Sequence, residues 1–170
     1  FTCFRSAFAV TPPAADSRLA AMRSWLPEVL GEPDFALAPA SADASFRRYF
    51  RVSHTNGTAI VMDAPPEHED CRPFIKVAGL LRAAGVNAPE ILAQDLDQGF
   101  LLLTDLGNTS YLQALDAATA HRLFGDAIGA LLRWQQASKP GVLPPYDEAL
   151  LRRELQLFPD WYLARHLGLV

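Results

Sequence analysis

The chain has 170 residues, of which 50% are hydrophobic and 20% are charged, so it is long enough to bury one sizeable core. Its net charge of −4 predicts no broad basic surface, which argues against a nucleic-acid partner. No apolar run approaches the roughly 18 residues of a membrane-spanning helix, and the two cysteines, Cys3 and Cys71, favour a reducing cytoplasm over a disulfide framework.

The N-terminal part of the chain predicts one helix and one short strand. We expect residues 1–15 to be disordered or an artefact of where the reading frame was cut, because they carry only part of a signal-peptide pattern. A helix with apolar residues at helical spacing follows, with Asp16 or Ser17 as its cap. Pro27 is expected to end or kink this helix. Residues 35–37 predict a first strand.

A β-hairpin is predicted over residues 41–64. Small residues at 41–45 predict a flexible loop, and loops of this kind followed by arginines can cover an anionic ligand. The strand after the loop alternates, so one face carries Phe46, Arg48, Phe50 and Val52, and the other carries Arg47, Tyr49 and Arg51.

Asn56-Gly57 predicts a tight type I′ turn in this hairpin. The resulting register places Phe50 opposite Asp63, with Arg48 as the diagonal neighbour of Asp63 on the same face. Arg48 and Asp63 therefore form either a structural ion pair or a pair that meets phosphate or metal in a cleft.

The middle of the chain predicts a helix and two further strands. Residues 67–71 are of metal-ligand types, but their spacing matches no metal-binding pattern, and most of them are expected in the first turn of a helix. Asp70 caps this helix and Gly85 ends it. A strand begins near Pro89, and the wholly apolar strand 100–103 is expected at the centre of the sheet.

The remaining pattern is helical. Helices are predicted at about 110–115, 118–136 and 147–157, with a last one after Pro159. Strands followed by helices predict an α+β fold with two lobes that meet at residues 104–107.

Four strings of the sequence carry a resemblance to a known family: SADASFRRYFRV, VMDAPPEHEDCRPF, FLLLTDLG and RRELQLFPDWYLARHLG. Together with the order of elements, they resemble the aminoglycoside phosphotransferase and choline kinase-like family. They look most like its bacterial amino-sugar kinases, which phosphorylate the anomeric hydroxyl of N-acetylmuramate and N-acetylglucosamine in peptidoglycan recycling.

This resemblance implies a protein-kinase-like fold, in which residues 16–104 form a nucleotide-binding N-lobe with a small antiparallel sheet. Residues 105–107 form the hinge, and residues 108–170 are the beginning of a helical C-lobe, which we expect to be truncated. The implied ligands are ATP, Mg²⁺ and an amino sugar. The protein is expected to be a cytoplasmic monomer with no nucleic-acid or membrane partner.

The resemblance also implies a set of nucleotide contacts. The predicted set is Ser41, Asp43, Ser45, Arg47, Arg48, Val52, Asp63, Leu103, Thr104, Asp105 and Leu106. The loop 41–45 is expected to cover the phosphates, and the backbone of 103–106 to read the adenine edge. Val52, with Ile60 or Val61, is expected to form the apolar wall against the base.

The sequence departs from the family pattern where a phosphate-binding Lys is usual, because it has Met62-Asp63 there. The helical Glu that pairs with this Lys has no match either, since Phe74 falls near its place. We therefore predict that Arg48, with Arg47 as the other candidate, supplies the positive charge, because a guanidinium binds phosphate bidentately.

No catalytic or metal-binding residue is predicted in these 170 residues, because the family's His-x-Asp string with its downstream Asn and its later metal-binding Asp are absent from them. The chain alone is expected to be inactive, and the metal ligands are expected in a further C-terminal part.

Glu154 and Trp161 are predicted sugar contacts, since carbohydrate sites combine carboxylates with aromatic platforms. The alternative is an amphipathic helix with solvated charges. Two other functions stay open: an aminoglycoside or other small-molecule kinase of the same fold, and a non-catalytic nucleotide-binding or interaction module.

Overall fold

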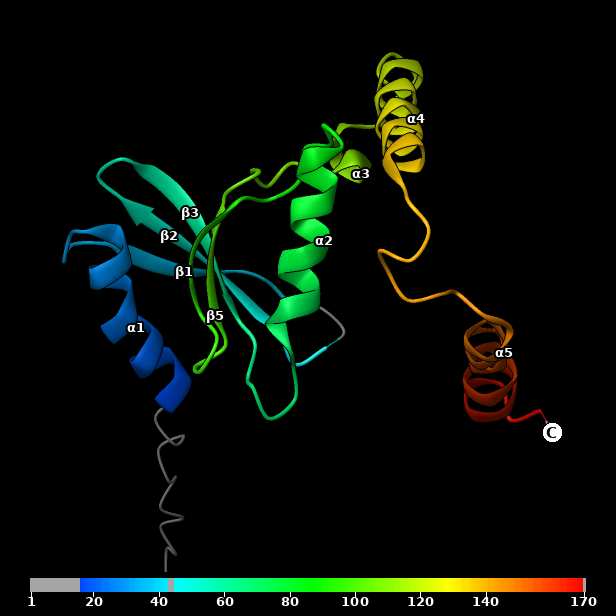
Figure 1. Ribbon diagram of the computed structural model, residues 1–170, viewed down its shortest axis with the longest axis horizontal. Coiled ribbons are helices and arrows are strands. Elements are labelled where there is room, and N and C mark those ends of the chain that lie inside the picture. Colours follow the sequence, from blue (N-terminus) through cyan, green and yellow to red (C-terminus); the bar gives the residue numbers. More distant parts are fainter. Residues whose placement is uncertain (1–15, 43–44, 170) are drawn as a thin grey trace, which may run out of the picture.

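The structure, a computed structural model, describes residues 16–42 and 45–169. An antiparallel sheet in the order β1-β2-β3-β5-β4 lies between α1 and α2 (Figure 1). The strands are β1 (Ala36–Ala42), β2 (Arg48–His54), β3 (Gly57–Asp63), β4 (Ile91–Asp95) and β5 (Phe100–Thr104). The helices are α1 (Ser17–Leu30), α2 (Cys71–Ala83), α3 (Tyr111–Ala114), α4 (Ala120–Ala137) and α5 (Glu148–Leu157), followed by the π-helix η1 (Phe158–His166). The predicted α+β class is confirmed.

Helix α1 covers one face of the sheet. Its predicted cap is confirmed, because the Asp16 carboxylate accepts a hydrogen bond from the Leu19 amide at 3.0 Å. Met22 and Leu26 are fully buried and Trp25 nearly so. Of the two alternatives predicted for Pro27, an end or a kink, the end is wrong, since the helix continues to Leu30. Burying these three large side chains outweighs the roughly 3 kcal/mol that an internal proline costs.

Helix α2 covers the other face. The predicted cap is again confirmed, because the Asp70 carboxylate accepts from the Arg72 amide at 2.9 Å, and Gly85 follows the helix with a φ of 72°. The prediction that most of residues 67–71 lie in its first turn is wrong, since Asp70 caps the helix and only Cys71 of these residues lies inside it. Within residues 16–42 and 45–169, no group of three or more His, Cys, Asp or Glu side chains is arranged to hold a metal ion.

The β2–β3 hairpin turns at Thr55 and Asn56, one residue earlier than predicted. Neither residue has a positive φ angle, whereas Gly57 opens β3 with a φ of 132°. The predicted turn is wrong because a residue outside the hairpin fixes Thr55. The Glu32 carboxylate accepts hydrogen bonds from both the amide of Thr55, at 3.1 Å, and its hydroxyl.

The pairing of the hairpin is therefore shifted by two positions from the predicted register. Arg48 lies directly opposite Asp63, and Phe50 lies opposite Val61. A shift of two positions leaves every side chain on its predicted face. The prediction that Arg48 and Asp63 share a face is thus confirmed, although their diagonal relation is not.

Strand β5 is central, as predicted, because it pairs with β3 on one side and β4 on the other, and its four apolar residues are buried. Strand β1 extends through Ala42, so Ser41 lies in a strand and not in the predicted loop. The loop residue Asp43 and the N-terminal residues 1–15 lie outside the described residues.

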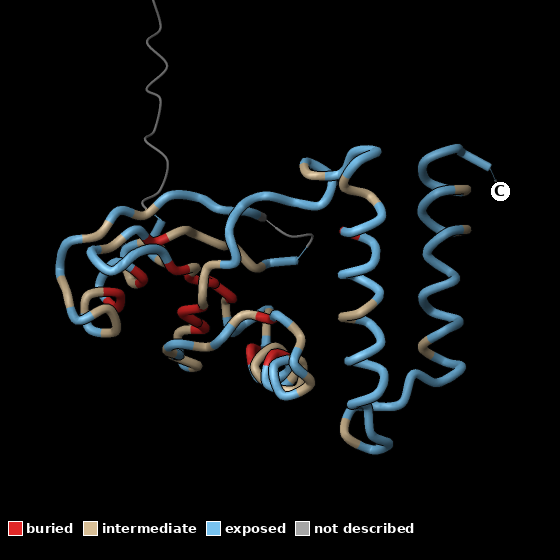
Figure 2. The backbone as a smooth tube through the Cα atoms, turned by 90° about the horizontal axis from the view of Figure 1, so that it is seen from above, coloured by how far each residue is buried: buried red, intermediate tan, exposed pale blue. Residues whose placement is uncertain are grey.

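The helices predicted in the C-terminal part are confirmed, with α4 and α5 close to their expected bounds. Ser110 and Gln113 form a capping box at α3. Figure 2 shows the buried residues gathered in the sheet, α1 and α2, whereas α4 and α5 are exposed along most of their length. Of the helices in the described part of the chain, none combines the length and apolar composition that crossing a membrane requires.

Candidate nucleotide site

A cavity of about 480 Å³ lies on the α2 face of the sheet, beside the segment that follows β5. We call it the hinge cavity. Its described lining comprises Ala40, Ser41, Tyr49, Arg51, Ile60, Phe74, Pro89 and residues 103–110. This volume lies in the range of small-molecule sites, and the lining combines apolar side chains with a few polar groups, as such sites do.

The predicted hinge lies along this cavity. Ser41, Leu103, Thr104, Asp105 and Leu106 of the predicted nucleotide-binding set contribute to its lining. Ile60, one of the alternatives for the apolar wall, lines it as well. The structure thus brings together residues of β1, β3 and β5 that are distant in the sequence.

Arg48 and Asp63 lie on the opposite face of the sheet, under α1. The Asp63 side chain is fully buried, with Oδ1 accepting from Arg18 Nε at 2.7 Å and Oδ2 from Arg48 Nε at 2.8 Å. Arg48 Nη1 also donates to Asp16 Oδ2 at 2.5 Å. This hydrogen bond, with the Leu19 amide, lowers the pKa of Asp16 to about 2. We call Asp16, Arg18, Arg48 and Asp63 the α1 network. Of the two interpretations of Arg48 and Asp63, the structure therefore favours a structural ion pair.

Val52 lies on the same side of the sheet as the α1 network. Its side chain is fully buried in the cluster that contains Met22 and Leu26. The structure therefore does not support a contact of Val52, Arg48 or Asp63 with a ligand in the hinge cavity. The cause is strand alternation, since all three side chains point toward α1.

Arg47 lies at the loop end of the other face. Its Nε donates to Ser45 Oγ at 3.1 Å and lies 3.8 Å from Glu69 Oε2. Glu69 precedes α2, so the Arg47 side chain is on the α2 side of the sheet, where the hinge cavity also lies. Of the two predicted cations, Arg47 is therefore the one on the same face of the sheet as the hinge cavity.

Arg51 and Tyr49 line the hinge cavity but were absent from the predicted set. The strand alternation that placed them on the face of Arg47 was the available signal. Arg51 forms a bidentate ion pair with Asp105, whose side chain is only 7% exposed. The guanidinium, with the Gly107 amide, lowers the pKa of Asp105 to about 2, so the pair is ionised at neutral pH.

A family model described as the phosphotransferase enzyme family matches residues 36–169, which include the whole sheet and the hinge cavity. The chain belongs to this family. The match agrees with the antiparallel sheet and the helix α2 that together form one wall of the hinge cavity.

Relatives within this phosphotransferase family are similar over most of the chain. An N-acetylmuramate/N-acetylglucosamine kinase of Pseudomonas aeruginosa is 56% identical over 163 residues, which are 90% of this chain and 48% of the relative. Proteins of the same name from Pseudomonas putida and Neisseria meningitidis are 48% and 46% identical, over 92% and 86% of this chain and 49% and 45% of the relatives. The chain thus spans about half the length of these curated relatives.

The position where phosphotransferases of this fold are expected to carry a phosphate-binding Lys is apolar here. Met62 is fully buried on the α2 face, and Phe74 of α2 packs against the cluster that Met62 forms with Leu101 and Leu103. An apolar contact thus takes the place of the expected Lys–Glu pair.

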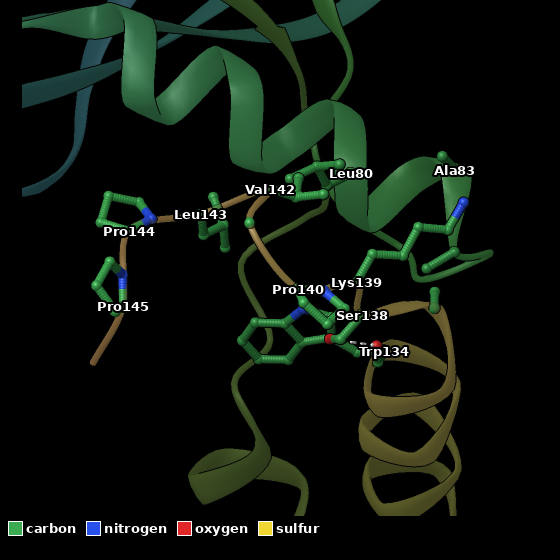
Figure 3. Close-up of a pocket in the computed structure, with 13 residues that line it drawn as sticks. Leu80, Ala83, Trp134, Ser138, Lys139, Pro140, Val142, Leu143, Pro144 and Pro145 are labelled. Carbon is green, nitrogen blue, oxygen red and sulfur yellow. Dashed lines mark hydrogen bonds between the residues drawn. The ribbon is translucent and has the colours of Figure 1, made fainter. Parts of the chain in front are cut away.

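A larger cavity, of about 890 Å³, lies between the end of α2 and the loop after α4 (Figure 3). Leu80, Trp134 and Val142 contribute to its lining, and Lys139 is the one charged residue among the described residues that line it. Lys76 Nζ of α2 donates a hydrogen bond of 2.5 Å to the Val142 carbonyl, which holds the loop against α2. Despite its size, this cavity lacks the convergent polar groups that orient a nucleotide, so the hinge cavity is the candidate site.

The predicted sugar contacts lie in the C-terminal helices, which Figures 1 and 2 show beyond α4 from the sheet. Glu154 in α5 is exposed, and its Oε1 lies 3.7 Å from Arg153 Nε. Trp161 in η1 is 57% exposed, and the Arg165 guanidinium lies 4.2 Å from its ring centroid. Neither residue lines the hinge cavity, so their role in sugar binding stays a prediction.

Proposed function

We propose that the protein is an ATP-dependent phosphotransferase that phosphorylates the anomeric hydroxyl of N-acetylmuramate and N-acetylglucosamine. The observation that carries this proposal is the hinge cavity, which is bounded by the predicted hinge in a chain of the phosphotransferase family. The names of the relatives supply the sugar.

Phosphoryl transfer depends on positioning and on neutralising charge. The described residues that support a nucleotide site are the lining of the hinge cavity, which suits a base, and Arg47 on the same face of the sheet. Mg²⁺ would gather the charge of the phosphates during transfer. No group of acidic, His or Cys side chains in the described part fits such an ion, so we place its ligands, and the base for the acceptor hydroxyl, in a further C-terminal part.

The test uses the extended protein, meaning this chain continued to the length of its curated relatives. We expect ADP formation with N-acetylmuramate and N-acetylglucosamine but not with kanamycin. Phosphorylation at the anomeric hydroxyl removes the reducing end, so the reducing-sugar signal should fall in step with ADP. Turnover of kanamycin alone would support the aminoglycoside alternative, and nucleotide binding without any turnover would support a binding module.

Arg47, and not Arg48, is expected to bind the phosphates. We expect Arg47→Ala to raise the KM for ATP by about tenfold in the extended protein, because it removes a charge-assisted contact. Arg48→Ala should change this KM by less than about threefold and instead lower the midpoint of denaturant unfolding, because it opens the α1 network. Initial rates with ATP varied separate the two variants, and the reverse pattern would return the role to Arg48.

A cytoplasmic monomer without nucleic-acid or membrane partners is also part of the proposal. Cys71 is free and buried, and burial raises the pKa of its thiol, which suits an unreactive core cysteine in a reducing compartment.

A further inference from the structure

Arg51 connects the middle of β2 to the hinge across the intervening strand β3. Its Nε donates to Asp105 Oδ2 at 2.6 Å, and its Nη2 donates to Asp105 Oδ1 at 3.1 Å. On the α2 face, Arg51 pairs with Ile60 of β3, and Ile60 pairs with Leu103 of β5. The guanidinium therefore reaches over β3 to the residue that follows β5.

The same contacts close residues 105–107 into a fixed turn. Arg51 Nη2 donates to the Gly107 carbonyl at 3.3 Å, and the Gly107 amide donates to Asp105 Oδ1 at 2.9 Å. Gly107 has a φ of 89°, which a residue with a side chain adopts only under strain. One guanidinium thus holds both the side chain of Asp105 and the backbone two residues later.

The side chains of Asp105 and Arg51 are largely occupied by their contact with each other. The Asp105 side chain is 7% exposed and the Arg51 side chain 27% exposed. The Asp105 oxygens already accept from Arg51 and Gly107, so this carboxylate is poorly placed to bind the hydroxyl of a ligand. The contribution of the pair to the hinge cavity is therefore the shape and rigidity of its wall.

We propose that Arg51 is a positioning residue for the nucleotide. It holds the hinge 105–107 against the sheet, so that the hinge backbone is already ordered when the base binds. The inference rests on the proposed function and deepens it. Ordering a binding segment in advance improves affinity because binding no longer has to restrict that segment. The gain in affinity concerns the binding of the base and does not depend on the phosphates.

The alternative is that Arg51 binds phosphate directly, and the choice of ligand separates the two. We expect Arg51→Ala and Asp105→Asn each to weaken binding of adenosine and of ATP by the same factor, about tenfold, in calorimetric titrations of the extended protein. A direct phosphate contact would instead weaken ATP binding in Arg51→Ala and spare adenosine. Asp105→Asn would then leave affinity unchanged or improve it.

Coupling between the two residues gives a second readout. The double variant should bind no more weakly than either single variant, because each one alone opens the same contact. Arg51→Lys should restore part of the affinity, since an ammonium can reach Asp105 but cannot form the bidentate pair. The KM for the sugar should stay unchanged in every variant.

Arg122→Ala serves as the matched control, because Arg122 forms an exposed ion pair with Asp126 on α4, away from the cavity. Thermal unfolding checks that the variants are folded, and Arg51→Lys and Asp105→Asn keep the test open should Arg51→Ala not fold. Unchanged adenosine binding in folded variants would overturn the inference alone. Failure of the unaltered protein to bind any adenine nucleotide would instead refute the proposed function.

Discussion

Replacing Asp63 with alanine is expected to lower the free energy of unfolding by about 3–5 kcal/mol, the usual cost of breaking a buried ion pair from one side. Asp63 is fully buried, and its two oxygens accept from different arginines, Arg18 and Arg48. Removing the carboxylate leaves the Arg18 guanidinium of α1 without its ion-pair partner and leaves Arg48 with Asp16 alone. Arg18→Ala should cost less, because Asp63 keeps its contact with Arg48.

Denaturant unfolding of the extended protein measures this effect, followed by the fluorescence of Trp25 after the protein's other tryptophans, Trp134 and Trp161 among them, are replaced with Phe. Trp25 is suited to report on the contact between α1 and the sheet, because its ring lies 5.7 Å from that of Phe100. Asp126→Ala is the control, since its ion pair with Arg122 is exposed and should contribute less than about 0.5 kcal/mol. An Asp63→Ala midpoint equal to that of the control would show that the α1 network does not stabilise the fold.

Gly99→Ala is expected to destabilise the protein by about 3 kcal/mol. Gly99 lies in the turn between β4 and β5 with a φ of 72°, and a Cβ there would lie 1.9 Å from the Ala64 carbonyl oxygen. The backbone must move to relieve this overlap. This movement would also weaken the hydrogen bond from the Ala64 amide to the Gly99 carbonyl, which is 2.9 Å long in the unaltered protein.

Gly31→Ala is the matched control for this substitution. Gly31 has nearly the same φ, 71°, but a Cβ there meets no atom within 4 Å. It therefore carries the strain of a left-handed backbone, about 1–2 kcal/mol, without the overlap. Thermal unfolding of both variants should show the larger loss for Gly99→Ala, and equal losses would mean that the turn relaxes freely around the new methyl group.

The sequence predicted most of the fold because its local signals agree with its packing. The caps at Asp16 and Asp70 and the apolar strand β5 were all predictable from local pattern. The predictions were wrong where residues distant in the sequence determine the local structure. Glu32 fixes the hairpin turn from outside the hairpin, and burial against the sheet carries α1 through Pro27.

The candidate site was predictable to a smaller extent. The residues that the resemblance assigns to the hinge lie beside a cavity, but the resemblance could not show which face of the sheet the cavity occupies. Arg48 was chosen by its residue type, although strand alternation and pairing with Asp63 turn it toward α1. Strand alternation placed Arg51 on the face of the cavity, but its ion pair with Asp105 could not be predicted, because the two residues lie 54 positions apart and no local pattern reveals such a pair.

The packing of α1 bears on where a domain of this protein begins. The family match starts at residue 36, after α1 has ended. A recombinant version trimmed to that start would lose Met22, Trp25 and Leu26 and would uncover the sheet face that they bury. It would also deprive Asp63 of Arg18. The seventeenth to thirtieth residues are thus as much a part of this folded unit as the strands of its sheet, and excision at the family border would cut through its core.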